Sequence, residues 1–113
     1  MILNATTATN SVSITDNTLS WTNAALTASA AGVLEFDFGA VAPSLTVSPF
    51  IVSGLADFTA ATPTVRVVVA SPLATGTYPL MTWGSSSGTT PTAVSVSAMQ
   101  LGTAATLSVS GNT

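Results

Sequence analysis

The chain has 113 residues, of which 47% are hydrophobic and only 4% charged, and its formal net charge is −3. Its length suits one domain, and its hydrophobic content excludes a disordered chain, which combines low hydrophobicity with high net charge. Because Arg66 is the only Lys or Arg, the composition also excludes nucleic acid as a partner, since phosphate binding requires several cations.

Targeting and membrane signals are weak. Apolar stretches extend over only a handful of residues before Ser, Thr or Pro interrupts them, whereas a membrane-spanning helix needs about 20. We therefore predict no membrane insertion. The opening MILNATTATN lacks the cationic and apolar regions of a signal peptide, so none is expected in the chain as given. Sparse charge and abundant Ser and Thr favour an extracellular or cell-surface location.

Alternation of apolar and polar residues, bounded by turn residues, recurs along the chain and predicts half-buried strands. Residues 12–15 and 19–22 alternate in this way and, joined by a turn at Asp16-Asn17, predict a hairpin. Residues 23–32 are expected to link this hairpin to the next strand. The later predicted strands are 33–38, the run 44–54 interrupted by Pro49, 64–70, a strand within 74–88, 93–99 and 105–113.

The expected fold class is all-β, with little or no helix. An antiparallel β-sandwich, a jelly-roll-like fold and a short β-solenoid are all compatible with this strand pattern. Residues 1–10 are expected to form an extended N-terminal segment, a candidate donor strand for another subunit. Residues 11–113 are expected to form a single all-β domain.

The strand at 33–38 carries two of the four acids, Glu35 and Asp37. Because side chains alternate along a strand, the two carboxylates share one face about 7 Å apart. Glycosidases use carboxylate pairs, but catalytic pairs lie across a cleft that separates their pKa values. We interpret Glu35 and Asp37 as the solvated face of the strand, and we expect a surface ion pair with Arg66.

The residue types that support most covalent and metal chemistry are missing. The sequence has no His, Cys or Lys, so a Ser nucleophile lacks its usual activating base and zinc lacks its usual ligands. The acidic loop pattern that binds calcium is also missing. We predict that the protein is not an enzyme and has no cofactor and no metal site.

Three stretches together resemble a known family: LEFDFG (34–39), GTYPLMTWGSSSGT (76–89) and LSVSGNT (107–113). They are similar to the strand and turn pattern of bacterial autotransporter-associated β-strand repeat proteins, and the resemblance covers residues 33–113. It implies a secreted or surface protein of repetitive β architecture, frequently a β-solenoid. It implies no catalytic residues.

The segments VSITDNT (12–18) and LSVSGNT (107–113) share one frame, but only the first continues into another strand. We therefore expect the last strand to leave an open edge that a strand from another subunit completes. The predicted function is an extracellular structural protein that self-assembles head-to-tail into a filament, tube or surface layer. The predicted assembly residues are Ile2, Leu3, Leu107 and Val109.

Two alternatives remain open at this stage. One is a carbohydrate-binding or adhesive surface module, in which aromatic side chains near Trp83 stack on a glycan. The other is an inert repeat unit cut from a giant surface protein.

Overall fold

The computed structural model describes residues 2–3, 9–29, 31–100 and 102–113, and over these residues the chain forms strands and turns. This confirms the all-β class. No helix in the described part is long and apolar enough to cross a membrane. The strands are β1 (Ile2–Leu3), β2 (Thr9–Ser13), β3 (Trp21–Asn23), β4 (Leu26–Ala28), β5 (Val33–Asp37), β6 (Phe50–Phe58), β7 (Thr64–Val68), β8 (Met81–Gly88) and β9 (Val94–Val96).

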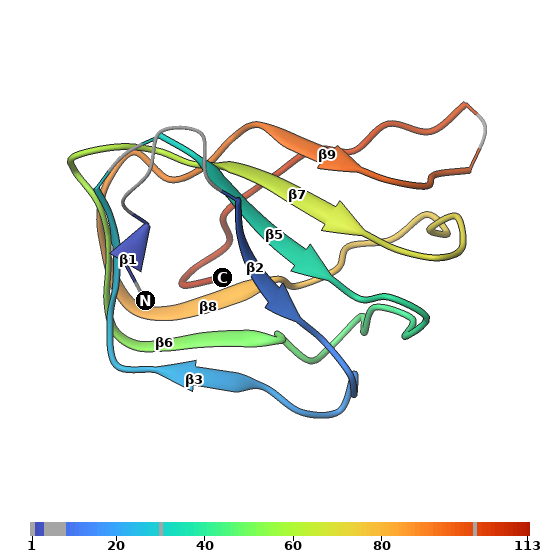
Figure 1. The fold of residues 1–113 in the computed structure, drawn as a ribbon, viewed down its shortest axis with the longest axis horizontal. Helices are drawn as coiled ribbons and strands as arrows, with labels where there is room; N and C mark the ends of the chain where they lie inside the picture. The colour runs from blue at the N-terminus through green and yellow to red at the C-terminus, as the bar shows by residue number, and fades with distance from the viewer. Residues whose placement is uncertain (1, 4–8, 30, 101) are drawn as a thin grey trace.

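The strands form two sheets, and the chain alternates between them except that β3 and β4 both lie in sheet A (Figure 1). In sheet A, β3 and β4 both pair with one edge of β6, β1 pairs with β4, and β8 pairs with the opposite edge of β6. Sheet B contains β2, β5, β7 and β9 in that order. Parallel neighbours need a long crossover connection, and here a strand of the opposite sheet lies within each crossover. The chain therefore winds in circuits of roughly thirty residues, so that β5, for example, pairs with β7.

The antiparallel expectation is wrong, because every described strand pair is parallel. The hairpin predicted around Asp16-Asn17 is wrong for the same reason. The turn does form, but it carries the chain from β2 in sheet B to β3 in sheet A, where Trp21 pairs with Phe50. Period-two alternation is the same in parallel and antiparallel strands, so it could not separate the two arrangements.

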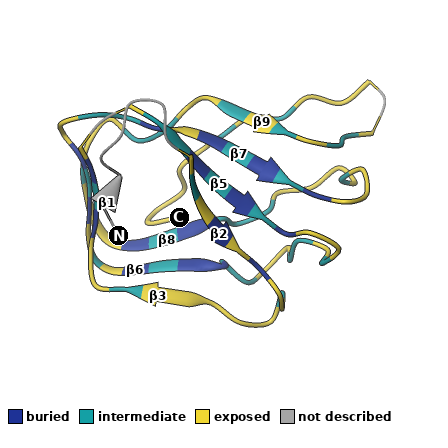
Figure 2. Cartoon of the chain, in the orientation of Figure 1, coloured by how far each residue is buried: buried dark blue, intermediate teal, exposed yellow. Residues whose placement is uncertain are grey.

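The core lies between the two sheets, where the inward side chains of successive circuits stack in rows. One row in sheet B consists of Val12, Phe36, Val67 and Val96, which are register partners from β2 to β9. Phe36 in the middle of this row is only 1% exposed. Figure 2 shows the same pattern along β5, β7, β6 and β8, where buried and less buried residues alternate. β-Branched and aromatic residues suit this half-buried pleated surface.

The boundaries of several predicted elements change in the structure. The run interrupted by Pro49 forms its strand only after the proline, because β6 begins at Phe50; proline cannot donate a hydrogen bond within a ladder. The linker predicted at 23–32 contains the short strand β4. The last predicted strand, 105–113, is not a strand, and it ends in a turn in which Ser110 and Thr113 exchange backbone hydrogen bonds.

Candidate functional site

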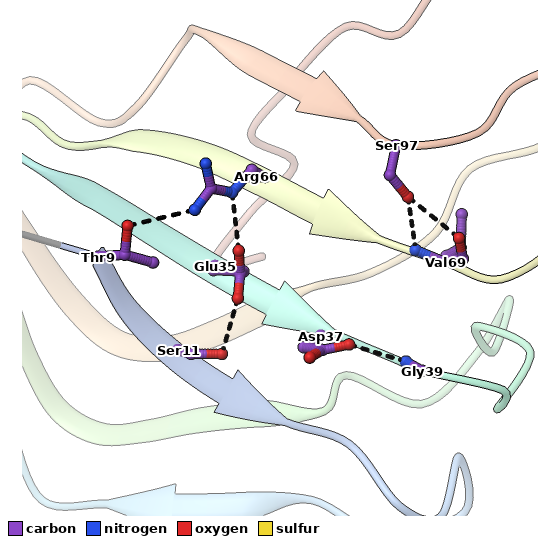
Figure 3. Close-up of polar contacts among 8 residues, drawn as sticks. All are labelled: Thr9, Ser11, Glu35, Asp37, Gly39, Arg66, Val69 and Ser97. Carbon is purple, nitrogen blue, oxygen red and sulfur yellow. Dashed lines mark hydrogen bonds and ion pairs between the residues drawn. The ribbon is translucent and has the colours of Figure 1, made fainter.

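A polar network lies on the outer face of sheet B, where Glu35 and Arg66 are register partners on β5 and β7. The Arg66 Nε donates to Glu35 Oε2 at 2.7 Å (Figure 3). The β2 side chains extend the network, because Arg66 Nη2 donates to Thr9 Oγ1 at 3.2 Å and Ser11 Oγ donates to Glu35 Oε1 at 3.1 Å. Three adjacent strands are therefore linked by one ion pair and its flanking hydroxyl groups.

The second acid of the strand, Asp37, does not join this network. Its Oδ1 accepts a hydrogen bond from the backbone N–H of Gly39 at 2.9 Å, in the turn that follows β5 (Figure 3). Glu35 and Asp37 thus serve two separate local structures. Both side chains are half-buried on the surface of a regular strand, and they do not face each other across a cleft as catalytic carboxylates do.

The other two acids each close a turn. Oδ1 of Asp16 accepts bonds from the hydroxyl and N–H of Thr18 at 2.6 and 2.8 Å, and Oδ1 of Asp57 accepts equivalent bonds from Thr59 at 2.6 and 2.9 Å. These bonds favour the charged carboxylates, so they lower the pKa of both groups. Among the described residues, no group of three or more acids, His or Cys gathers to hold a metal ion.

The two outer strands of sheet B each have one free side. β2 pairs only with β5, and β9 pairs only with β7, among the described strands. They lie at opposite margins of the sheet (Figure 1). Free strand edges present unpaired N–H and C=O groups, which makes them templates for another strand. These edges are the feature of the structure most directly suited to binding another β-strand.

The ends of the molecule also expose apolar side chains. Trp21 of β3 is 63% exposed and the preceding Leu19 is 65% exposed. Sequence reasoning placed Trp21 in a hairpin strand and favoured a core role for the aromatic side chains, so it missed this exposure. The exposure results from the position of Trp21 in the first described circuit, where no described strand pairs with the outer side of β3.

A cavity of about 860 Å³ lies between the sheets and extends to the last circuit, with Leu45 and Val109 among its lining residues. Its walls come from β5, β7, β9, the start of β8, the connections around 43–48 and 73–80, and the C-terminal stretch. None of the lining side chains is charged. Pockets of about 300–1,000 Å³ are the usual size for small-molecule sites.

The predicted assembly residues occupy different environments. The strand β1, formed by Ile2 and Leu3, pairs in parallel with β4 of the same chain, so the structure does not present it as a free donor. Residues 1 and 4–8 of the same predicted segment lie outside the described residues. At the C-terminus, Leu107 is half-buried against the core and Val109 is 47% exposed.

The aromatic residue of the carbohydrate alternative, Trp83, is only 7% exposed and belongs to the core. Its backbone N–H donates to the carbonyl of Asn112 at 2.9 Å, which ties the C-terminal turn to β8. The ring is therefore not presented as a stacking surface for a sugar.

Comparison with protein-family models, curated proteins and solved structures found no match. The resemblance to autotransporter-associated β-strand repeat proteins therefore stays a prediction.

Proposed function

We propose that this chain is a short β-solenoid that serves as a structural building block and assembles head-to-tail with further copies of itself. In this contact β9 of one copy pairs with β2 of the next, so that sheet B continues across the junction. The observation that carries the proposal is that β2 and β9 are the two margins of one parallel sheet, each with one side free among the described strands.

The backbone hydrogen bonds identify which amides face the free sides. On β2, the N–H of Ile14 donates to Asp37 in β5, and because amides alternate in direction along a strand, those of Ser11 and Ser13 face outward. On β9, the N–H of Ser97 donates to Val67 in β7. The amides of Val94 and Val96 therefore face outward.

The side-chain rows support the same junction. Val94 and Val96 point inward but are only half-buried, because no described strand pairs with the outer side of β9. A second copy would place Val12 of β2 after Val96 in the row and would extend the core across the contact. With one cation and four acids in the chain, repulsion between copies is small.

Such a contact joins two different surfaces, so it repeats without closing unless the rotation between copies makes a ring. Filaments or tubes are the expected products. The proposed mechanism differs from the one predicted from sequence, because it uses strand edges already formed in the folded unit and requires no release of β1. The extracellular location stays a prediction from composition.

The test blocks one free edge at a time with proline, which cannot donate to a neighbouring strand. Ser13→Pro removes an outward N–H of β2 at an exposed position, and Val96→Pro removes an outward N–H of β9 at a half-buried position. Circular dichroism verifies that each variant is folded, and Ser13→Ala is the matched control that keeps the amide.

We expect sedimentation velocity to show polymers for the wild type and for Ser13→Ala, and monomers for each proline variant alone. An equal mixture of the two proline variants should give dimers and nothing larger, since one intact β9 edge and one intact β2 edge remain. Polymers from the folded Ser13→Pro variant, or a wild type that stays monomeric at every concentration, would refute the proposal.

A further inference from the structure

The exposed apolar side chains gather at the two ends that the proposed assembly brings together. Leu19 and Trp21 lie at the first circuit, and Val109 lies in the C-terminal stretch after β9, where it lines the cavity together with Leu45 of the connection between β5 and β6. Large exposed apolar groups on a soluble chain mark interaction surfaces when they gather. The fifth such residue, Leu55, lies on the central strand β6, away from both ends.

The exposure of Trp21 results from its place in the sheet. It is the register partner of Phe50, which pairs in turn with Met81, and both of these residues are buried. On β4, which pairs with β1, Leu26 is fully buried. Trp21 thus begins a core row whose outer neighbour is missing among the described residues.

The cavity is the complementary surface. Among its lining residues are Phe36 and Val67 in sheet B and Met81 and Trp83 in sheet A, so it reaches the same core that Trp21 begins at the other end. It contains no charged side chain, which makes it unsuited to a charged ligand and suited to an aromatic ring.

Resting on the proposed head-to-tail assembly, we infer that Trp21, with Leu19 beside it, is the anchor of the contact and enters the cavity of the neighbouring copy. The direction agrees, because β2 and β3 belong to the first circuit, whereas β9 and the C-terminal stretch, which supply part of the cavity wall, belong to the last. Buried Trp side chains in pockets are frequent anchors of protein interfaces. The proposed occupant of the cavity is therefore a second copy of this chain.

Trp21→Ala should weaken assembly by about tenfold or more, as truncating an anchor residue does. Leu55→Ala, which truncates an exposed apolar side chain away from both ends, should leave assembly unchanged. Leu45→Glu, which places a charge in the cavity wall, should also block polymers. Mixed Trp21→Ala and Leu45→Glu chains should form dimers, because one chain retains Trp21 and the other retains an unaltered cavity.

Acrylamide quenching reports the position of the ring directly. Trp21→Phe leaves only the buried Trp83, so the difference between wild type and this variant isolates the emission of Trp21. We expect that emission to become protected from quencher and to shift to shorter wavelength as the protein assembles.

Four results would overturn the inference. If the wild type assembles but Trp21→Ala assembles equally well, the head-to-tail proposal stands and the anchor is wrong. If Trp21 stays quenchable in the assembled protein, or if the uncharged apolar dye Nile red fills the cavity equally in assembled and dispersed protein, the cavity is not the receiving site. If the wild type never assembles, both proposals fail together.

Discussion

Replacing Arg66 tests what the ion pair on sheet B contributes to stability. The Arg66 side chain is 42% exposed and that of Glu35 is 16% exposed, so the ion pair is intermediate between a fully exposed and a fully buried one. A fully exposed ion pair contributes about 0.2–1 kcal/mol, whereas a hydrogen bond to a charged group contributes about 1.5–3 kcal/mol. Glu35 also keeps its bond from Ser11 when the guanidinium is removed.

We therefore expect Arg66→Ala to lower the free energy of unfolding by about 1–2 kcal/mol and the melting temperature by about 4–8 °C. Arg66→Met separates the two parts of this loss, since it keeps most of the aliphatic stem and removes the charge. Urea unfolding of Arg66→Met, Glu35→Ala and the double variant gives the coupling energy, which we expect to be about 1 kcal/mol. It should shrink in about 1 M salt.

Two outcomes contradict this reasoning. A loss above about 4 kcal/mol would mean that Glu35 behaves as a buried charge without a partner. A coupling energy of zero would mean that the ion pair contributes no more than the separate side chains do. Asp37→Asn is the internal control. Because Asp37 bonds to the Gly39 N–H and not to Arg66, this substitution should leave the coupling energy between Arg66 and Glu35 unchanged.

The remaining predictions concern turns. Gly88→Ala should destabilise by about 2–5 kcal/mol in urea titrations, because its φ is +77° and a Cβ would collide with the Phe58 carbonyl. Gly39→Ala, at φ +52° with no atom within 4 Å of the Cβ position, should cost only about 1–2 kcal/mol, and equal losses would refute the role of the close approach. Since Thr59 lowers the pKa of Asp57 in the folded protein, this group's stabilisation is present above its unfolded pKa and is lost as pH falls through the lowered value. The decline in melting temperature under acid should be smaller in Asp57→Asn, and an unchanged pH profile would contradict this.

The sequence predicted the polar surface of sheet B better than the path of the chain. Alternation alone placed Glu35 on the outer face, and the strand around Arg66 was correctly located. The ion pair between Glu35 and Arg66 then required only that their two strands be neighbours. Strand direction was not available from alternation, because both arrangements bury every second residue. The informative signal was a recurrence roughly thirty residues apart, in which Leu34-Glu35-Phe36, Val65-Arg66-Val67 and Val94-Ser95-Val96 repeat one pattern and become register partners.

The pairing and exposure of residues at the ends of the molecule were harder to predict from the sequence. Ile2 and Leu3 were interpreted as free, but the structure pairs them with β4. Apolar residues at a strand end have the same pattern whether a neighbour covers them or not, so exposure at Trp21 follows from its position in the stack and not from its local sequence. The same limit applies to Trp83, which the carbohydrate alternative required to be exposed but which is buried.

The winding of the chain in circuits has a consequence for how the protein folds. Each described strand pairs with a strand from another circuit, so native contacts are mostly distant in sequence, and folding by such contacts is slow. A completed circuit, however, offers the next one a ready edge, and in stacked repeat proteins structure propagates from neighbour to neighbour. A folded molecule presents the free edge of its last circuit to an unfolded copy as well. Adding a small amount of folded protein should therefore shorten the delay before the unfolded chains refold, as a seed does in crystal growth.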